Sequence, residues 1–220
     1  MTQEEKELGL DNPAVVAKSI KGHQQYVEEI SPDFVKIMER WFFRYPSDLY
    51  SKEIKSIREL KGIQPIGEHH LWMKTDWSGQ GDSFPFHEEI ASFYNIFSPI
   101  SYLKRWFRTD QSRGDQVIAD FIKEDPETLA HVLDVIAGDI ATLSRRLIQE
   151  AGVEGIYYST QQVQDERVTD EEYRKFIEPS NIAVLEVANE AGGINILHIC
   201  GFEGASNEVG TLQGLSGSSH

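Results

Sequence analysis

The fold of this chain is decided by residues 125–160, which read DPETLAHVLDVIAGDIATLSRRLIQEAGVEGIYYST. Asp125 and the proline after it are typical of the cap and first position of a helix, and apolar side chains then recur three and four residues apart. Gly152 favours the end of that helix, and the aromatic and β-branched run 155–160 is typical of a strand. This stretch therefore predicts a long helix that leads into a strand.

The alternation of strands and helices continues on both sides of that stretch. Strands alternating with helices predict parallel βαβ units and an α/β fold. The strand NILHICG at 195–201 is expected to be short and buried. The other expected strands are 34–38 and 92–97, and the other expected helices are 13–30, 53–60, much of 100–122, one that starts at Thr169 and is interrupted by Pro179, and 181–189.

The composition is that of a globular protein, with 220 residues of which 40% are hydrophobic and 26% are charged. A formal net charge of −15 argues against a nucleic acid or an anionic membrane as partner, because both need a basic protein surface. The single cysteine allows no internal disulfide and favours a reducing compartment. Since no apolar run reaches the length of a membrane span or forms an N-terminal signal, we expect a cytoplasmic protein.

His198 and Cys200 form the strongest candidate site. Two residues apart on a strand, they point to the same side, so an imidazole and a thiol meet at its carboxyl end. Both groups are zinc ligands, and a catalytic zinc needs three ligands from the protein. No second cysteine exists, so the third ligand would be Glu, Asp or another His, with His69, His70 and Asp33 as candidates. The alternative is a buried thiol that packs as a small apolar group beside a hydrogen-bonded histidine.

Several segments together resemble the uroporphyrinogen decarboxylase superfamily, which contains haem-pathway decarboxylases and zinc-dependent methyltransferases that demethylate corrinoid proteins. The resemblance implies a (β/α)8 TIM barrel. Family members are much longer, so we expect an incomplete barrel domain over 31–209 with about five of the eight strands, an acidic helical segment over 1–30, and a flexible tail or cloning remnant over 210–220. The matching segments are PDFVKIM at 32–38, IFSP at 96–99, the helix at 125–149, AGVEGIYYS at 151–159, FIEP at 176–179 and ILHICG at 196–201.

The resemblance implies an enzyme that transfers a methyl group from a methyl-corrinoid to a thiol, with zinc bound by His198 and Cys200. The arginine- and glycine-rich N-terminal segment of the true decarboxylases has no counterpart here, which favours the methyltransferase branch. Tyr102 lies near the position of a substrate-facing tyrosine of the decarboxylases, although a tyrosine on a helix is more often half-buried packing. Ser159 and Thr160 follow a strand end, where the family places a polar residue that faces the substrate.

Two other functions stay open. The first is a metal-free decarboxylase that acts on a tetrapyrrole in porphyrin synthesis, and zinc dependence distinguishes it from the methyltransferase. The second is a truncated, non-catalytic scaffold or interaction module, which would associate through exposed strand edges. We expect a homo-oligomer that binds a small-molecule or tetrapyrrole substrate, with a corrinoid protein as a further partner of the methyltransferase. Lys36 and Glu39 are expected to pair as charges at the barrel rim.

Overall fold

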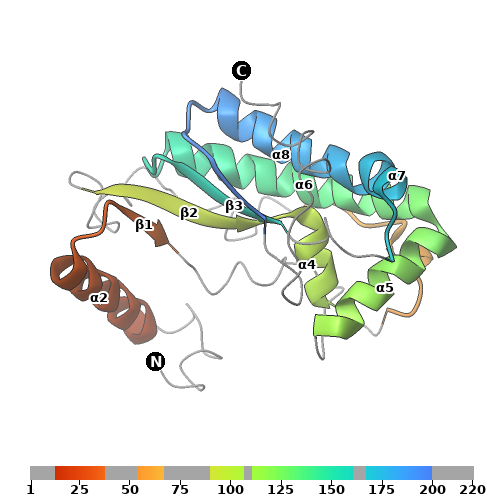
Figure 1. Ribbon diagram of the computed structural model, residues 1–220, viewed down its shortest axis with the longest axis horizontal. Helices are drawn as coiled ribbons and strands as arrows, with labels where there is room; N and C mark the ends of the chain where they lie inside the picture. Colours follow the sequence, from red (N-terminus) through yellow and green to blue (C-terminus); the bar gives the residue numbers. More distant parts are fainter. Residues whose placement is uncertain (1–12, 38–53, 67–89, 107–110, 161–166, 200–220) are drawn as a thin grey trace.

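A parallel four-stranded sheet with helices packed against it forms the centre of the molecule (Figure 1), as seen in a computed structural model that describes residues 13–37, 54–66, 90–106, 111–160 and 167–199. The strand order follows the sequence, and each strand is parallel to its neighbour. The predicted α/β class is therefore confirmed. The strands are β1 (Phe34–Ile37), β2 (Ala91–Phe97), β3 (Gly155–Thr160) and β4 (Ile196–Ile199).

Helices lie between the strands in the sequence, and two of them, α6 (Pro126–Gln149) and α8 (Glu178–Glu190), lie side by side along one side of the sheet (Figure 1). No helix in the described ranges is long and apolar enough to cross a membrane. The helices are α2 (Pro13–Ile30), a 3-10 turn η4 (Ile57–Leu60), α4 (Pro99–Trp106), α5 (Gln111–Glu124), α6 (Pro126–Gln149), α7 (Asp170–Glu172), a π-helical segment η7 (Tyr173–Ile177) and α8 (Glu178–Glu190).

The helix and strand predicted from residues 125–160 are confirmed as α6 and β3. Asp125 caps α6, and its Oδ1 accepts a hydrogen bond of 3.1 Å from the Thr128 backbone N–H. Gly152 has a positive φ of 71° just after the helix, a conformation that glycine adopts without strain. The chain then turns back and enters β3 beside β2.

The predicted helix over 53–60 is wrong in length. The described part is a single 3-10 turn, Ile57–Leu60, and Glu53 lies outside the described residues. Ser56 caps this turn, since its Oγ accepts from the Arg58 N–H at 3.2 Å and its own N–H donates to the Glu59 carboxylate at 3.0 Å. The cap thus supports one turn, and the chain leaves helical structure directly afterwards.

The predicted interruption at Pro179 is also wrong, because helical structure runs continuously from α7 through η7 into α8. The N–H of Glu178 donates to the Tyr173 carbonyl, five residues back, at the junction of η7 and α8. Pro179 follows directly and lacks the N–H that would continue this hydrogen-bond pattern. The wide π turn therefore lets the chain pass the proline without a break. The Thr169 cap predicted at the start of this run is confirmed, with the Thr169 hydroxyl accepting from the Glu172 N–H at 3.2 Å.

Strand β4 is half-buried along all four of its residues, so the prediction of a buried strand is wrong. It lies at one edge of the sheet, with β3 as its neighbour. Leu197 still packs against the core. The N–H of Ile194, which precedes β4, donates to the Glu154 carbonyl at 2.8 Å, and Gly155 permits this approach because a Cβ there would clash with the Ile194 carbonyl.

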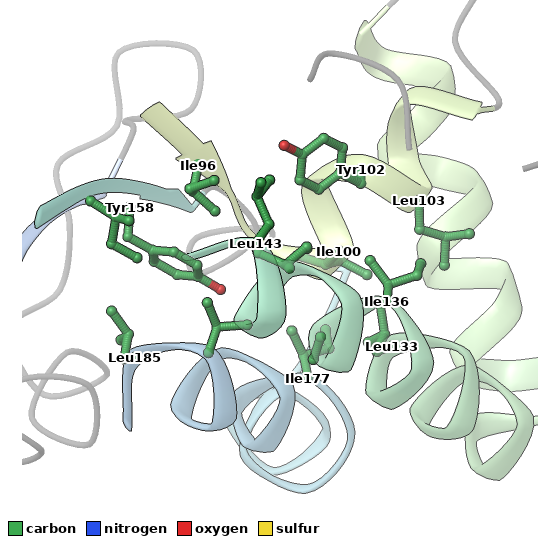
Figure 2. Packing of buried hydrophobic residues seen from close by; sticks show 14 of the residues in the cluster. Ile96, Ile100, Tyr102, Leu103, Leu133, Ile136, Leu143, Tyr158, Ile177 and Leu185 are labelled. Carbon is green, nitrogen blue, oxygen red and sulfur yellow. The ribbon is translucent and has the colours of Figure 1, made fainter. Parts of the chain in front are cut away.

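The hydrophobic core lies between the sheet and helices α4, α6, η7 and α8. The alternate side chains of β2 and β3 that point to this side, including Ile96 and Tyr158, are fully buried. Figure 2 shows them pointing from the strands toward Leu143 of α6 and Leu185 of α8. Burial of this layer supplies much of the stability of the fold, because each Å² of apolar area removed from water contributes about 25 cal/mol. The opposite side of the sheet carries a different set of side chains.

Candidate functional site

The second side of the sheet carries polar side chains from all four strands. Residues paired in register point to the same side, and alternate residues along a strand share a face. We call the side turned away from α6 and α8 the polar face. It consists of Phe34 and Lys36 of β1, Ala91, Phe93, Asn95 and Phe97 of β2, Gly155, Tyr157 and Ser159 of β3, and Ile196 and His198 of β4.

Lys36, Tyr157 and His198 form a row across this face. The ammonium of Lys36 lies 3.9 Å from the centroid of the Tyr157 ring, in a cation–π contact. The imidazole of His198 lies on the next strand, with its centroid 5.3 Å from that of Tyr157. Burial lowers the pKa of His198, and the charge of Lys36 lowers this pKa further. His198 is therefore neutral at pH 7 and has a lone pair available for a proton or a metal.

Lys36 thus contacts a ring, whereas its predicted partner Glu39 lies outside the described residues.

Asn95 and Ser159 form the second polar pair of the face. The Ser159 hydroxyl donates to Oδ1 of Asn95 at 3.1 Å, and both side chains are almost completely buried. Ser159 is also the register partner of His198 on β4. An amide, a hydroxyl and a neutral imidazole therefore lie on three neighbouring strands, toward the carboxyl half of the sheet. Small-molecule sites of open and closed parallel sheets form at this end.

The two predicted catalytic residues at the end of β3 point in opposite directions. Ser159 belongs to the polar face, whereas Thr160 points toward the helices. Thr160 is fully buried, and its Oγ1 has no hydrogen-bond partner in the described parts of the chain. The structure therefore brings Ser159 close to His198 and separates Thr160 from both.

Tyr102, the third predicted catalytic residue, is fully buried in α4 and belongs to the core (Figure 2). Its ring contacts that of Phe97 edge to face, with 5.8 Å between centroids. Tyr102 therefore packs in the core, as the alternative interpretation of this tyrosine expected, and it is completely buried where that interpretation expected half-burial.

Of the predicted zinc ligands, His198 is described, while Cys200, His69 and His70 lie outside the described residues. Asp33 precedes the amino end of β1, at the edge of the sheet opposite to β4. Three strand spacings of about 4.8 Å separate these edges, so Asp33 is too distant to share an ion with His198. Within the described ranges, no group of three or more His, Cys, Asp or Glu side chains could hold a metal. His198 fits as one ligand, and the others would come from residues outside these ranges.

Sequence reasoning missed a buried ion pair between Lys104 of α4 and Asp115 of α5. Arg167 approaches the same carboxylate, with 3.9 Å between Nη2 and Oδ2. Lys104 and Asp115 are 3% and 1% exposed, which is rare for charged residues and ties the two helices together. Helical periodicity alone could have placed both residues on inward faces, but it could not have paired them.

A hydrogen-bonded network within the core was missed as well. The Tyr158 hydroxyl donates to Oδ1 of Asn181 at 2.7 Å, and Nδ2 of Asn181 lies 3.3 Å from the Tyr173 hydroxyl. Burial raises the pKa of both phenols, so they stay protonated and serve as hydrogen-bonding groups. This network joins β3 to η7 and α8 and has a structural role.

Comparison with known proteins gives no relative: no protein-family model, no curated protein and no solved structure matches this chain. The chemistry of the site must therefore be argued from its own geometry. A neutral imidazole can take a proton or bind a metal, an amide and a hydroxyl can orient a substrate oxygen, and a lysine can attract an anion. These groups converge on the polar face.

Proposed function

We propose that this chain is an enzyme domain of the uroporphyrinogen decarboxylase type, with β1 to β4 as one side of a (β/α)8 barrel. Parallel strands in sequence order, with helices along one side of the sheet, are what a barrel wall requires. The polar face would then line the barrel interior. A reducing compartment such as the cytoplasm would keep Cys200 as a thiol.

Within this family we propose methyl transfer from a methyl-corrinoid to a thiol, with zinc bound through His198 and Cys200. The observation that carries this proposal is the position and the state of His198. Its imidazole lies on the polar face at the carboxyl end of the sheet, and burial together with Lys36 favours its neutral form. Metal ligation requires this form, so no proton has to be removed before an ion binds.

Zinc at this site would lower the pKa of a substrate thiol, so that the thiol loses its proton to solvent near neutral pH. The sulfur would then form a bond to the methyl carbon of the donor while the carbon–cobalt bond breaks, and the electron pair of that bond would stay with cobalt. The protein's own groups would orient the thiol: Tyr157 offers a flat apolar surface beside His198, and Ser159 fixes the Asn95 amide on the same face. The donor would be presented by a corrinoid protein.

A metal-free tetrapyrrole decarboxylase is the second candidate. The lysine on the polar face favours it, because such substrates carry carboxylates. However, Lys36 is the single lysine or arginine among the described residues of this face. A substrate with several carboxylates needs several cations, so the methyltransferase is preferred.

An interaction module is the third candidate, and the edge of the sheet favours it. Within the described residues no strand pairs with the outer edge of β4, and Ile194 just before it is 72% exposed. Such an edge can pair with a second copy, which agrees with the expected homo-oligomer. Analytical ultracentrifugation would show a concentration-dependent dimer if this edge is used.

A methyl-transfer assay tests the proposed activity. Purified chain is mixed with zinc, methylcobalamin and 2-mercaptoethanol without oxygen, and the methyl sulfide product is measured by mass spectrometry. We expect His198→Asn and Cys200→Ser to reduce the rate to that without protein. His131→Asn is the matched control, because His131 lies exposed on α6 and away from the polar face. Equal rates for wild type and His198→Asn would refute the proposal.

A further inference from the structure

Asn95 is the residue of the polar face that the proposed chemistry leaves with unused hydrogen-bonding capacity. Only 3% of its surface is exposed, and its Oδ1 accepts from Ser159 at 3.1 Å. Its Nδ2 makes no hydrogen bond within the described parts of the chain. Since the oxygen side of the amide is fixed, the two N–H donors are held in one orientation. Donors placed in advance bind an acceptor with little loss of rotamer entropy.

Lys36 brings a positive charge over the same part of the sheet. Strand β2 lies between β1 and β3, so the Lys36 side chain has to cross β2 to place its ammonium 3.9 Å from the Tyr157 ring centroid. Asn95 is the residue of β2 paired in register with Tyr157. The ammonium over the Tyr157 ring therefore lies beside the β2 position that Asn95 occupies. A fixed amide donor and a lysine ammonium on the same face, next to one ring, match the two acceptor oxygens of a carboxylate.

The remaining neighbours define the rest of the ligand. Phe34 and Phe93 contact edge to face with 5.7 Å between centroids, and the Tyr157 ring lies beside His198. Flat apolar surface thus lies on both sides of the polar centre. We propose that the polar face binds a small ligand with a single carboxylate, which Lys36 and the Asn95 amide hold while its apolar part packs on these rings. This inference rests on the proposed function in placing the substrate on the polar face.

Benzoate is a suitable probe, because it combines one carboxylate with one flat ring. The full chain, labelled with ¹⁵N, is titrated with benzoate without zinc or thiol, and side-chain amide signals are followed by NMR. The Asn95 signal is assigned by its loss in Asn95→Asp. We expect this signal to shift and saturate, and Lys36→Met to weaken binding about tenfold, as for the loss of one charge-assisted hydrogen bond. Benzamide, which lacks the charge, should bind more weakly than benzoate.

Lys175→Met is the matched control, because Lys175 also lies over a ring, 4.9 Å from the centroid of Phe176, but on η7. It should bind benzoate as wild type does. The proposal is wrong if the Asn95 amide does not shift, or if Lys36→Met and Lys175→Met bind benzoate equally. Well-dispersed spectra of both variants show that they are folded. Because zinc and thiol are left out, failure of methyl transfer and failure of carboxylate binding are separate results.

Discussion

Asp125 shows how one side chain contributes to both the fold and its pH dependence. The Thr128 backbone N–H donates to its carboxylate and holds the pKa of Asp125 below its usual value of 3.8, and Lys61, 3.3 Å from Oδ2, acts in the same direction. A carboxylate with a lowered pKa in the folded state stabilises that state above its unfolded pKa. The contribution is lost as the pH falls through the folded value.

We therefore predict that Asp125→Asn, which keeps the cap acceptor but removes the charge, melts at a lower temperature than wild type at pH 6. The difference should close as the pH falls below about 4, where the wild-type carboxylate takes up its proton. Thermal melts followed by circular dichroism across this range provide the measurement. Asp120→Asn, exposed on α5, serves as the control. A difference that stays constant down to pH 2 would contradict the account.

Single side chains of the site were predictable only where a strand was recognised. His198 was placed at a strand end by its position in an apolar run, and Ser159 by the run at 155–160. The period of two also separates Ser159 from Thr160, but which face is polar depends on where the helices pack. Asn95 was missed, although an amide within the run SFYNIF is a usable signal, since an apolar strand rarely contains an amide without a partner for it.

At the scale of elements, the Lys104–Asp115 pair joins α4 to α5. We predict that Lys104→Met destabilises the protein by about 3–5 kcal/mol, because it leaves a buried carboxylate without its cation. The double variant Lys104→Met/Asp115→Leu should recover most of this loss, since the uncompensated charge is then removed.

Urea unfolding followed by near-ultraviolet circular dichroism measures both variants, and the four tryptophans and eight tyrosines of the chain supply the signal. Arg167 is one-third exposed and can turn to solvent in the double variant. A double variant less stable than the single one would show that the charges are not the cause.

The elements that sequence predicted correctly are those with local signals. Helix α6 combines a cap, a first-turn proline and an apolar stripe, and β2 and β3 are short runs rich in aromatic residues and isoleucine. The π segment η7 was not predictable, because a proline normally indicates a break and the wide turn that accommodates it depends on packing against α6. The half-buried state of β4 depends on its place at the sheet edge, which no local pattern reveals.

At the scale of the whole molecule, the parallel sheet with strands in sequence order followed from alternating strands and helices. The polar face could not be predicted from the sequence, because it is formed by four strands whose relative register is set by long-range pairing. Lys36 illustrates the point: its ammonium lies over the ring of Tyr157, two strands away in the sheet. Chemistry on this face thus depends on residues that lie up to about 160 positions apart in the sequence, from β1 to β4.

The central claim is that His198 on the polar face binds zinc, and isothermal titration of the chain with zinc at pH 7 tests it most directly. We expect about one zinc ion per chain for wild type, loss of that binding in His198→Asn, and its retention in His131→Asn. Absence of zinc binding by wild type, or the same affinity in His198→Asn as in wild type, would contradict it.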